Sequence, residues 1–89
     1  MASYNVKIKG SAQKEIRKLS NKNLRNKLIS IINELYINPV PDEAKKIKGS
    51  NNIYRIRQGT YRIVYQIYKN DLLVIVIRVR HRKDAYKGL

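Results

Sequence analysis

The sequence predicts an α+β fold in which a helical hairpin packs on one face of a four-stranded, mostly antiparallel sheet, in the order β-α-α-β-β-β. Three observations support this fold. Residues 4–9 alternate polar and apolar side chains, which is typical of a strand. Residues 11–35 carry apolar side chains at helical spacing. Residues 53–79 contain three segments rich in Ile, Val and Tyr, separated by turn-forming residues.

The amino-terminal half is expected to form the first strand and both helices. Gly10 ends the strand, and Ser11 is the expected N-cap of the first helix. The polar residues 20–23 separate the helices, while Pro39 and Pro41 stop the second because proline cannot donate a backbone hydrogen bond. The apolar positions are Tyr4, Val6 and Ile8 in the strand, Ala12, Ile16 and Leu19 in the first helix, and Leu24, Leu28, Ile31, Ile32 and Leu35 in the second. The short link predicts antiparallel helices on one face of the sheet.

The carboxyl-terminal half is expected to form a three-stranded meander with turns at residues 58–60 and 69–71. Alternation assigns Tyr54, Ile56, Tyr61, Ile63, Tyr65 and Ile67 to the core side. It assigns Arg55, Arg57 and Arg62 to the opposite side, and we place Arg78 and Arg80 there as well. Because two short helices cover only one side of a sheet, this arginine-bearing face is expected to be open, concave and positive. Lys45, Lys46 and Lys48 are expected to extend its rim.

Composition limits the class of protein and indicates a polyanionic partner. The 89 residues are expected to form one domain, residues 1–89, with a formal net charge of +14. Residues 45–89 hold twelve basic and two acidic residues, so the sheet half carries a net +10. The absence of cysteine excludes disulfides and zinc–thiolate sites, and one His with six acidic residues predicts neither a metal site nor a cofactor. No apolar run is long enough to span a membrane and residues 1–10 show no signal-peptide pattern, so we expect a cytoplasmic protein.

Several familiar kinds of catalysis are missing from this chain. There is no Gly-rich phosphate loop, and one His without Cys cannot form a nucleophile–base triad. What remains is a concentration of Arg, Lys and Tyr, which can bind phosphates, stabilise a phosphorane and stack on bases. RNA supplies its own nucleophile, the 2′-hydroxyl, so a protein offering charge and positioning could cleave it. Each residue also has a structural interpretation: Arg55 and Arg57 as solvated strand residues, His81 as a loop residue, Tyr86 as a residue that packs the tail.

The order of these residues resembles a known family. The motifs are Lys45-Lys46-Ile47-Lys48-Gly49, Tyr54-Arg55-Ile56-Arg57, Tyr61-Arg62-Ile63-Val64-Tyr65 and His81-Arg82-Lys83-Asp84-Ala85-Tyr86. Together they resemble the RelE/ParE superfamily of bacterial and archaeal toxins, nearest the RelE branch, over nearly the whole chain. The resemblance implies a ribosome-dependent endoribonuclease that cuts mRNA in the ribosomal A site. It also implies neutralisation by a cognate RelB-like antitoxin that wraps the toxin.

The resemblance also implies roles for individual residues. Arg62 matches the arginine that stabilises the transition state, Arg82 the arginine near the leaving oxygen, and Tyr86 the tyrosine that contacts the cut nucleotide. His81 fits the histidine found before that arginine in many members. The expected RNA-binding residues are Lys45, Lys46, Lys48, Arg55, Arg57, Arg80 and Lys83.

Two departures from the family pattern matter for the chemistry. Arg55 and Arg57 stand where the best-known RelE enzymes have lysines, and arginine cannot act as a base near neutral pH. Proton transfer is therefore expected to shift toward His81 or Lys48. The carboxyl terminus is also short, so residues 83–89 are expected to form a short tail, at most one helical turn.

Two alternatives to the nuclease remain open. One is the ParE branch, which has the same fold but inhibits DNA gyrase. The retained set of Arg62, His81, Arg82 and Tyr86 argues against it, because a gyrase inhibitor has no need of a phosphate-cleaving constellation. The other is a basic RNA- or DNA-binding module without turnover.

Overall fold

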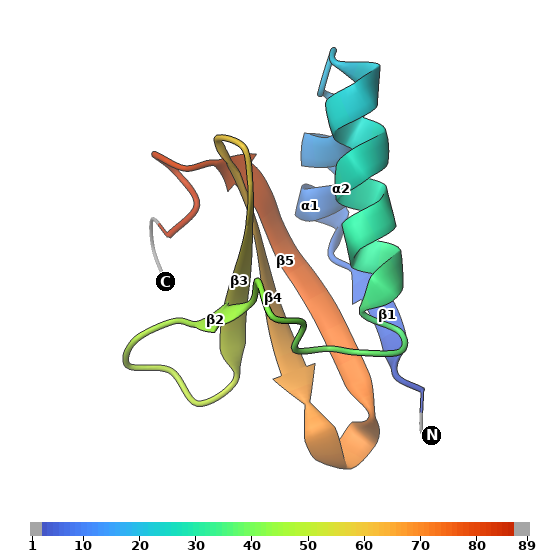
Figure 1. The fold of residues 1–89 in the computed structure, drawn as a ribbon, viewed down its shortest axis with the longest axis vertical. Coiled ribbons are helices and arrows are strands. Elements are labelled where there is room, and N and C mark those ends of the chain that lie inside the picture. Colours follow the sequence, from blue (N-terminus) through green and yellow to red (C-terminus); the bar gives the residue numbers. More distant parts are fainter. Residues whose placement is uncertain (1–2, 87–89) are drawn as a thin grey trace.

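Two helices and a five-stranded sheet make up residues 3–86, the part of the chain that the computed structural model describes (Figure 1). The elements are β1 (Asn5–Ile8), α1 (Gly10–Arg17), α2 (Lys22–Glu34), β2 (Lys45–Lys46), β3 (Ile53–Gln58), β4 (Tyr61–Tyr68), the 3₁₀ turn η1 (Lys69–Asp71) and β5 (Leu73–His81). The sheet order is β1-β5-β4-β3-β2, with β1 parallel to β5 and all other pairs antiparallel. The predicted α+β class and mostly antiparallel sheet are confirmed.

The predicted number of strands is wrong by one. Lys45 and Lys46, expected on the rim, form the short strand β2 and pair with Arg55 and Tyr54 of β3. The composition of β2 gives no strand signal, because two lysines favour neither a strand nor a buried position. The free edge of β3 supplies the backbone partners that make these residues a strand.

Both helices lie on the same side of the sheet and run in opposite directions (Figure 1). The N-cap predicted for α1 is wrong: the helix begins at Gly10, and Lys9 occupies the cap position without a side-chain hydrogen bond. The Lys9 N–H still pairs with Val76 O of β5, so the chain passes directly from strand into helix. The cap of α2 lies in the predicted polar link, where Asn21 Oδ1 accepts the Leu24 N–H at 3.1 Å. Within residues 3–86, neither helix is both long and apolar enough to cross a membrane.

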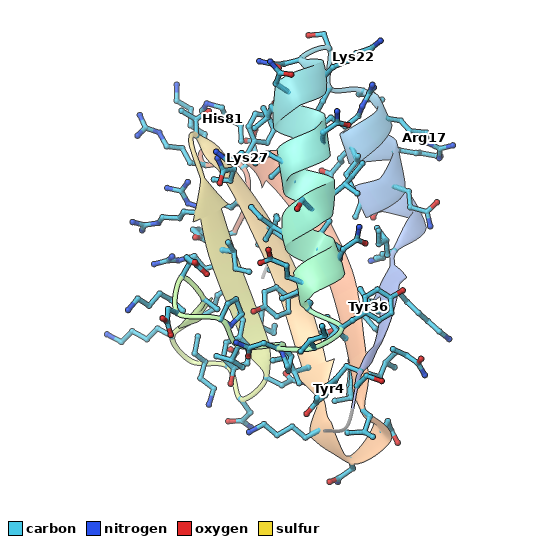
Figure 2. All side chains as sticks on the ribbon, turned by 45° about the vertical axis from the view of Figure 1, so that its right-hand side comes forward. Tyr4, Arg17, Lys22, Lys27, Tyr36 and His81 are labelled. Carbon is cyan, nitrogen blue, oxygen red and sulfur yellow. The ribbon has the colours of Figure 1, made fainter. Side chains whose placement is uncertain are left out.

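The core lies between the helices and the sheet. Its buried side chains are Ala12, Ile16, Leu28, Ile32, Leu35, Ile56, Ile63, Tyr65, Ile67, Val74, Val76 and Val79. Tyr65 is fully buried and donates its hydroxyl hydrogen to Pro39 O at 2.7 Å. Burial raises the pKa of this hydroxyl well above its ordinary value, and nearby Tyr54 and Glu43 act in the same direction. Figure 2 shows Tyr4 and Tyr36 at one end of the molecule and His81 at the other.

A β-bulge in β5 changes which of its side chains face the helices. Tyr65 pairs with Val76, but Val64 pairs with Arg78, so Ile77 is an extra residue in the ladder. Before the bulge, Val76 faces the core from an even-numbered position. After it, Val79 faces the core from an odd-numbered position. The bulge therefore places Arg78 on the face away from the helices.

Candidate nucleic-acid-binding and catalytic site

Three arginines lie directly opposite one another across the three longest strands. In the strand register, Arg57 of β3 pairs with Arg62 of β4, and Arg62 pairs with Arg80 of β5. Residues directly opposite on adjacent strands share a face, and here it is the face away from the helices, although the Arg80 side chain turns at the edge of β5 to contact Glu15 of α1. We call Arg57, Arg62 and Arg80 the arginine row.

The central arginine of the row is held inside the protein. Arg62 is only 9% exposed, although its neighbour Arg57 is exposed. Its Nη1 donates to Tyr61 O at 3.2 Å and to Gly59 O at 3.4 Å, while its buried Nε has no partner within residues 3–86. A buried donor without a partner is costly, so such a group is a candidate for ligand binding or catalysis. A phosphate oxygen is the natural partner for a guanidinium.

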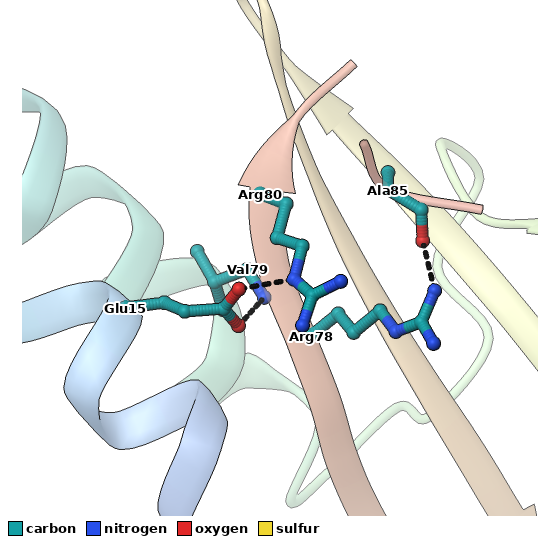
Figure 3. A network of polar contacts seen from close by, with 5 residues as sticks. All are labelled: Glu15, Arg78, Val79, Arg80 and Ala85. Atoms are coloured by element: carbon teal, nitrogen blue, oxygen red, sulfur yellow. Dashed lines mark hydrogen bonds and ion pairs between the residues drawn. The ribbon is translucent and has the colours of Figure 1, made fainter. Parts of the chain in front are cut away.

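The segment after β5 covers part of the face that was predicted to be open. Figure 1 shows this segment turning back on the side of the sheet opposite the helices. Arg78 Nη1 donates to Ala85 O at 3.2 Å (Figure 3), and the Arg82 N–H donates to Thr60 O at 2.7 Å. Val64 and Ala85 are fully buried as a result. The prediction of a wholly open face is therefore wrong, because the last turn packs on it. Residues 82–86 form turns rather than a helix, and residues 87–89 lie outside the described part.

Beside this covered patch is a shallow pocket of about 230 Å³ with a cationic lining. Its walls are Lys45, Lys46, Ile47, Lys48, Arg55, Arg57 and Tyr86. The structure thus brings together β2, the following loop, β3 and the last described residue. The pocket offers lysine and arginine groups for phosphates and an aromatic ring for a base. No His, Asp or Glu is among these lining residues.

Other predicted site residues lie around a different pocket, of about 510 Å³. It is lined by Glu15, Lys18, Leu19, Tyr61, Val79, Arg80, His81 and Asp84. His81 packs edge-on against Tyr61, with ring centroids 5.9 Å apart and an interplanar angle of 78°. His81 pairs with Tyr61 in the register and shares its helix-facing side. The structure therefore separates His81 from the pocket that contains Tyr86. Arg82 and Lys83 are exposed in the turn that follows β5.

Sequence reasoning missed one acidic residue that contacts the predicted site. Glu15 of α1 accepts the Val79 N–H at 3.1 Å through Oε1 and forms an ion pair with Arg80 Nε through Oε2 (Figure 3). These partners are more than 60 residues away in the chain. No sequence pattern links the helix position with the strand end. Within residues 3–86, no three His, Asp or Glu side chains cluster closely enough to hold a metal ion.

The cationic pocket can bind RNA phosphates, and Arg57 in its lining pairs in the strand register with the buried Arg62. Both features suit transfer of a phosphoryl group, because negative charge accumulates on the phosphorus oxygens as the reaction proceeds. Comparison with known proteins identifies the family of the chain. Residues 6–86 match the family model described as the ParE toxin of the type II toxin–antitoxin system parDE.

Relatives with RelE names cover almost the whole chain. The chain is 34% identical over 88 residues to the putative toxin RelE1 of Methanocaldococcus jannaschii, covering 96% of this chain and 97% of that protein. It is 33% identical over 91 residues to the mRNA interferase toxin RelE of Escherichia coli K12, covering 94% and 90%. The RelE–RelB complex from Pyrococcus horikoshii contains a chain with a TM-score of 0.80 and 27% identity, covering 93% and 99%. The protein therefore belongs to the RelE/ParE family of toxins from type II toxin–antitoxin systems, and its curated relatives are of the RelE type.

Proposed function

We propose that this toxin is a ribosome-dependent endoribonuclease that cleaves mRNA in the A site and thereby inhibits translation. The observation that carries the proposal is the arginine row, with the buried, unpartnered Nε of Arg62 at its centre. The cationic pocket that contains Tyr86 supports it, because its lining offers cationic groups for phosphates and an aromatic ring for a base. The relatives named mRNA interferase support the same reaction class.

The proposed reaction is an internal transfer of the phosphoryl group. The 2′-oxygen of one nucleotide attacks its own 3′ phosphorus, and the bond from that phosphorus to the 5′-oxygen of the next nucleotide breaks. The products are a 2′,3′-cyclic phosphate and a 5′-hydroxyl, so a proton leaves the 2′-hydroxyl and another reaches the 5′-oxygen. Because RNA supplies the nucleophile, the protein's task is to position the phosphate and stabilise the added negative charge. No metal is required for that task.

Each group of residues has a separate role in this proposal. Arg62 stabilises the phosphorane, with Arg82 near the leaving oxygen, and Tyr86 stacks on the nucleotide at the cut. The cations that hold the RNA backbone are Lys45, Lys46, Lys48, Arg55, Arg57, Arg80 and Lys83. Of the two candidates for proton transfer, Lys48 lines the pocket with Tyr86, whereas His81 lines the other pocket. Lys48 is thus the better placed to protonate the leaving oxygen.

Dependence on the ribosome follows from what the cationic pocket lacks. A general base contributes typically about 10² to 10⁴ in rate, yet neither histidine nor carboxylate lines this pocket. The protein is therefore expected to bind RNA readily and to cut it slowly unless the scissile phosphate is bent into line. A bound ribosome can supply that geometry, and alignment of reacting groups is a large contribution to rate.

The partner in the cell is proposed to be a RelB-like antitoxin. Structural neighbours from three organisms are RelE–RelB complexes. The sheet half of this chain carries a net charge of +10, so the antitoxin is expected to present acidic and apolar side chains to it. Complex formation would cover the phosphate-binding surface and stop cleavage. The toxin and antitoxin are expected to form a hetero-oligomer.

The test is cleavage of one mRNA in two contexts by the purified toxin. Primer extension would map cuts on naked mRNA and on the same mRNA in programmed ribosomes. EDTA would be added only to the naked RNA, because ribosomes need Mg²⁺ to stay assembled. We expect codon-phased cuts on ribosomes, weak or no cutting of naked RNA, and no effect of EDTA on any residual cutting of naked RNA at high toxin concentration. Equal rates on the two substrates would contradict ribosome dependence. Loss of the residual cutting in EDTA would contradict the metal-free mechanism.

Inhibition of DNA gyrase is the second candidate function, because the matching family model carries the ParE name. The two functions separate in cells after brief induction of the toxin. Codon-phased 5′ ends in translated regions support the nuclease. A DNA-damage response without such ends supports gyrase inhibition. The absence of both codon-phased ends and a DNA-damage response supports a non-catalytic binding module.

A further inference from the structure

Glu15 lies where the edge of β5 loses its neighbouring strand. β1 pairs with β5 from Leu73 to Val76 and then ends, so the part of β5 beyond the bulge has no strand on that side. Val79 lies in this part and is buried. Its N–H would be unpaired without the Glu15 carboxylate, which accepts it at 3.1 Å. The Glu15 carboxylate thus accepts the hydrogen bond that a neighbouring strand would otherwise accept.

The second carboxylate oxygen of Glu15 contacts a member of the arginine row. Oε2 pairs with Arg80 Nε (Figure 3), so one carboxylate binds a backbone N–H and the next residue's guanidinium. Arg80 has five N–H donors, and the four on its two Nη atoms do not take part in this contact. A guanidinium held through Nε has a fixed plane, and its Nη edge can contact a phosphate at the pocket that Arg80 lines together with Glu15 and His81.

The support behind Glu15 is rigid. Its neighbours on α1, Ala12 and Ile16, are buried in the core, so the helix face that carries Glu15 is fixed against the sheet. The side chains of Glu15 and Arg80 are themselves 22% and 34% exposed. A partly exposed ion pair contributes little to stability, so its more important effect is on the direction of the arginine. Glu15 also places one negative charge beside Arg80.

We propose that Glu15 is a positioning residue that acts through Arg80 and holds its guanidinium toward an RNA phosphate at the edge of β5. The proposal rests on the nuclease function argued above. It predicts a particular kinetic signature, because Glu15 is an acid close to a polyanion. Removal of its charge should leave RNA binding unchanged or tighter and should lower only the turnover. A residue that merely stabilised the fold would weaken both.

The test variant is Glu15→Gln, because the amide oxygen can still accept the Val79 N–H. Its melting temperature should therefore match the wild type. The kcat on programmed ribosomes should fall by about 10- to 100-fold, the usual cost of a misplaced catalytic group, with KM equal or lower. The matched control is Asp71→Asn, which removes one negative charge in the turn η1 at the other end of β5. It should leave kcat unchanged.

A double-mutant cycle decides whether Glu15 acts through Arg80. Under single-turnover conditions, Glu15→Gln should cost nothing further in an Arg80→Ala background. Equal losses in both backgrounds, or an unchanged kcat for Glu15→Gln, would overturn the proposal while leaving the nuclease function intact. The NMR signal of Arg80 Nε–H gives a readout without cleavage: it should exchange slowly in the wild type and rapidly in Glu15→Gln. A wild type that does not cut on ribosomes overturns the proposed function, and this inference with it.

Discussion

Arg62→Met should separate stability from activity in this protein. Methionine has a similar length and no polar group, so it fills the space of a side chain that is only 9% exposed. Alanine would leave a cavity at this buried position. Methionine is therefore the sharper substitution.

The contacts of Arg62 allow the change in stability to be worked out. The variant loses the two hydrogen bonds from Nη1, which at 3.2 and 3.4 Å are long. Hydrogen bonds from charged groups contribute about 1.5–3 kcal/mol each when well formed, so each of these two long bonds should contribute no more than the lower value. The variant also relieves two unfavourable terms. It removes the buried, unpartnered Nε, which costs the wild type about 1–3 kcal/mol, and it removes the charge repulsion with Arg57 and Arg80. The terms nearly cancel, and the net change should stay within about 1 kcal/mol.

The expected loss of activity is much larger. Removal of one donor that stabilises a developing charge lowers the rate by about 10² to 10³, equivalent to about 2.7–4 kcal/mol. The assays are thermal melting and ribosome-dependent cleavage on the same preparation, with Arg17→Met as the control. Arg17 lies at the exposed end of α1 (Figure 2), and its replacement should change neither quantity.

Two results would refute this reasoning. Cleavage by Arg62→Met at more than a tenth of the wild-type rate would mean that Arg62 does not stabilise the transition state. A melting temperature lowered by more than about 10 °C, which in a chain of this size exceeds 1 kcal/mol, would mean that Arg62 is mainly structural.

The remaining predictions concern three other features. Tyr86→Ala should raise KM by about 10- to 100-fold, since stacking contributes about 1–3 kcal/mol per base; Tyr86→Phe should keep the wild-type KM, and an unchanged KM in the alanine variant would exclude stacking. Tyr65→Phe should lower the free energy of unfolding by about 1 kcal/mol through loss of the bond to Pro39 O. Burial raises the pKa of Tyr65 above its unfolded value of about 10, so the difference in free energy of unfolding between wild type and Tyr65→Phe should be largest below pH 10 and should shrink at higher pH. Denaturant titrations that give the same difference at pH 8 and pH 11 would contradict this prediction. Association with the antitoxin should slow steeply as salt rises, because opposite charges steer the encounter; stopped-flow rates that are flat with salt would contradict the electrostatic argument.

The elements with clear periodicity could be predicted from the sequence. The α2 stripe places Leu28, Ile32 and Leu35 in the core, as the helical spacing indicated. The first turn of the meander could likewise be predicted from Gly59, whose φ of 60° suits the two-residue turn between β3 and β4. In these segments, local preference and burial agree, so the pattern alone determines the structure.

The parts that sequence reasoning missed depend on contacts between distant segments. The run from Leu73 to Val79 is apolar at nearly every position, so it carries no signal of which face each residue takes, and the bulge at Ile77 could not be located. The side of the sheet that His81 takes depends on that bulge. The cover over Val64 likewise comes from Ala85, a small residue in a turn, and nothing in its identity indicates burial.

The extra residue in β5 gives this strand one position where the chain can lose a residue without exchanging its two faces. Deletion of Ile77 would leave Arg78 directly after Val76, and unbroken alternation would then keep Val79 toward the core and Arg78 and Arg80 on the opposite face. The deletion would remove the local bend and added twist that a bulge gives a strand. Deletion of Val79, in contrast, would turn an arginine into the hydrophobic layer. Among viable variants of this toxin, we therefore expect loss of the residue at position 77 to be tolerated and loss of the residue at position 79 not to be.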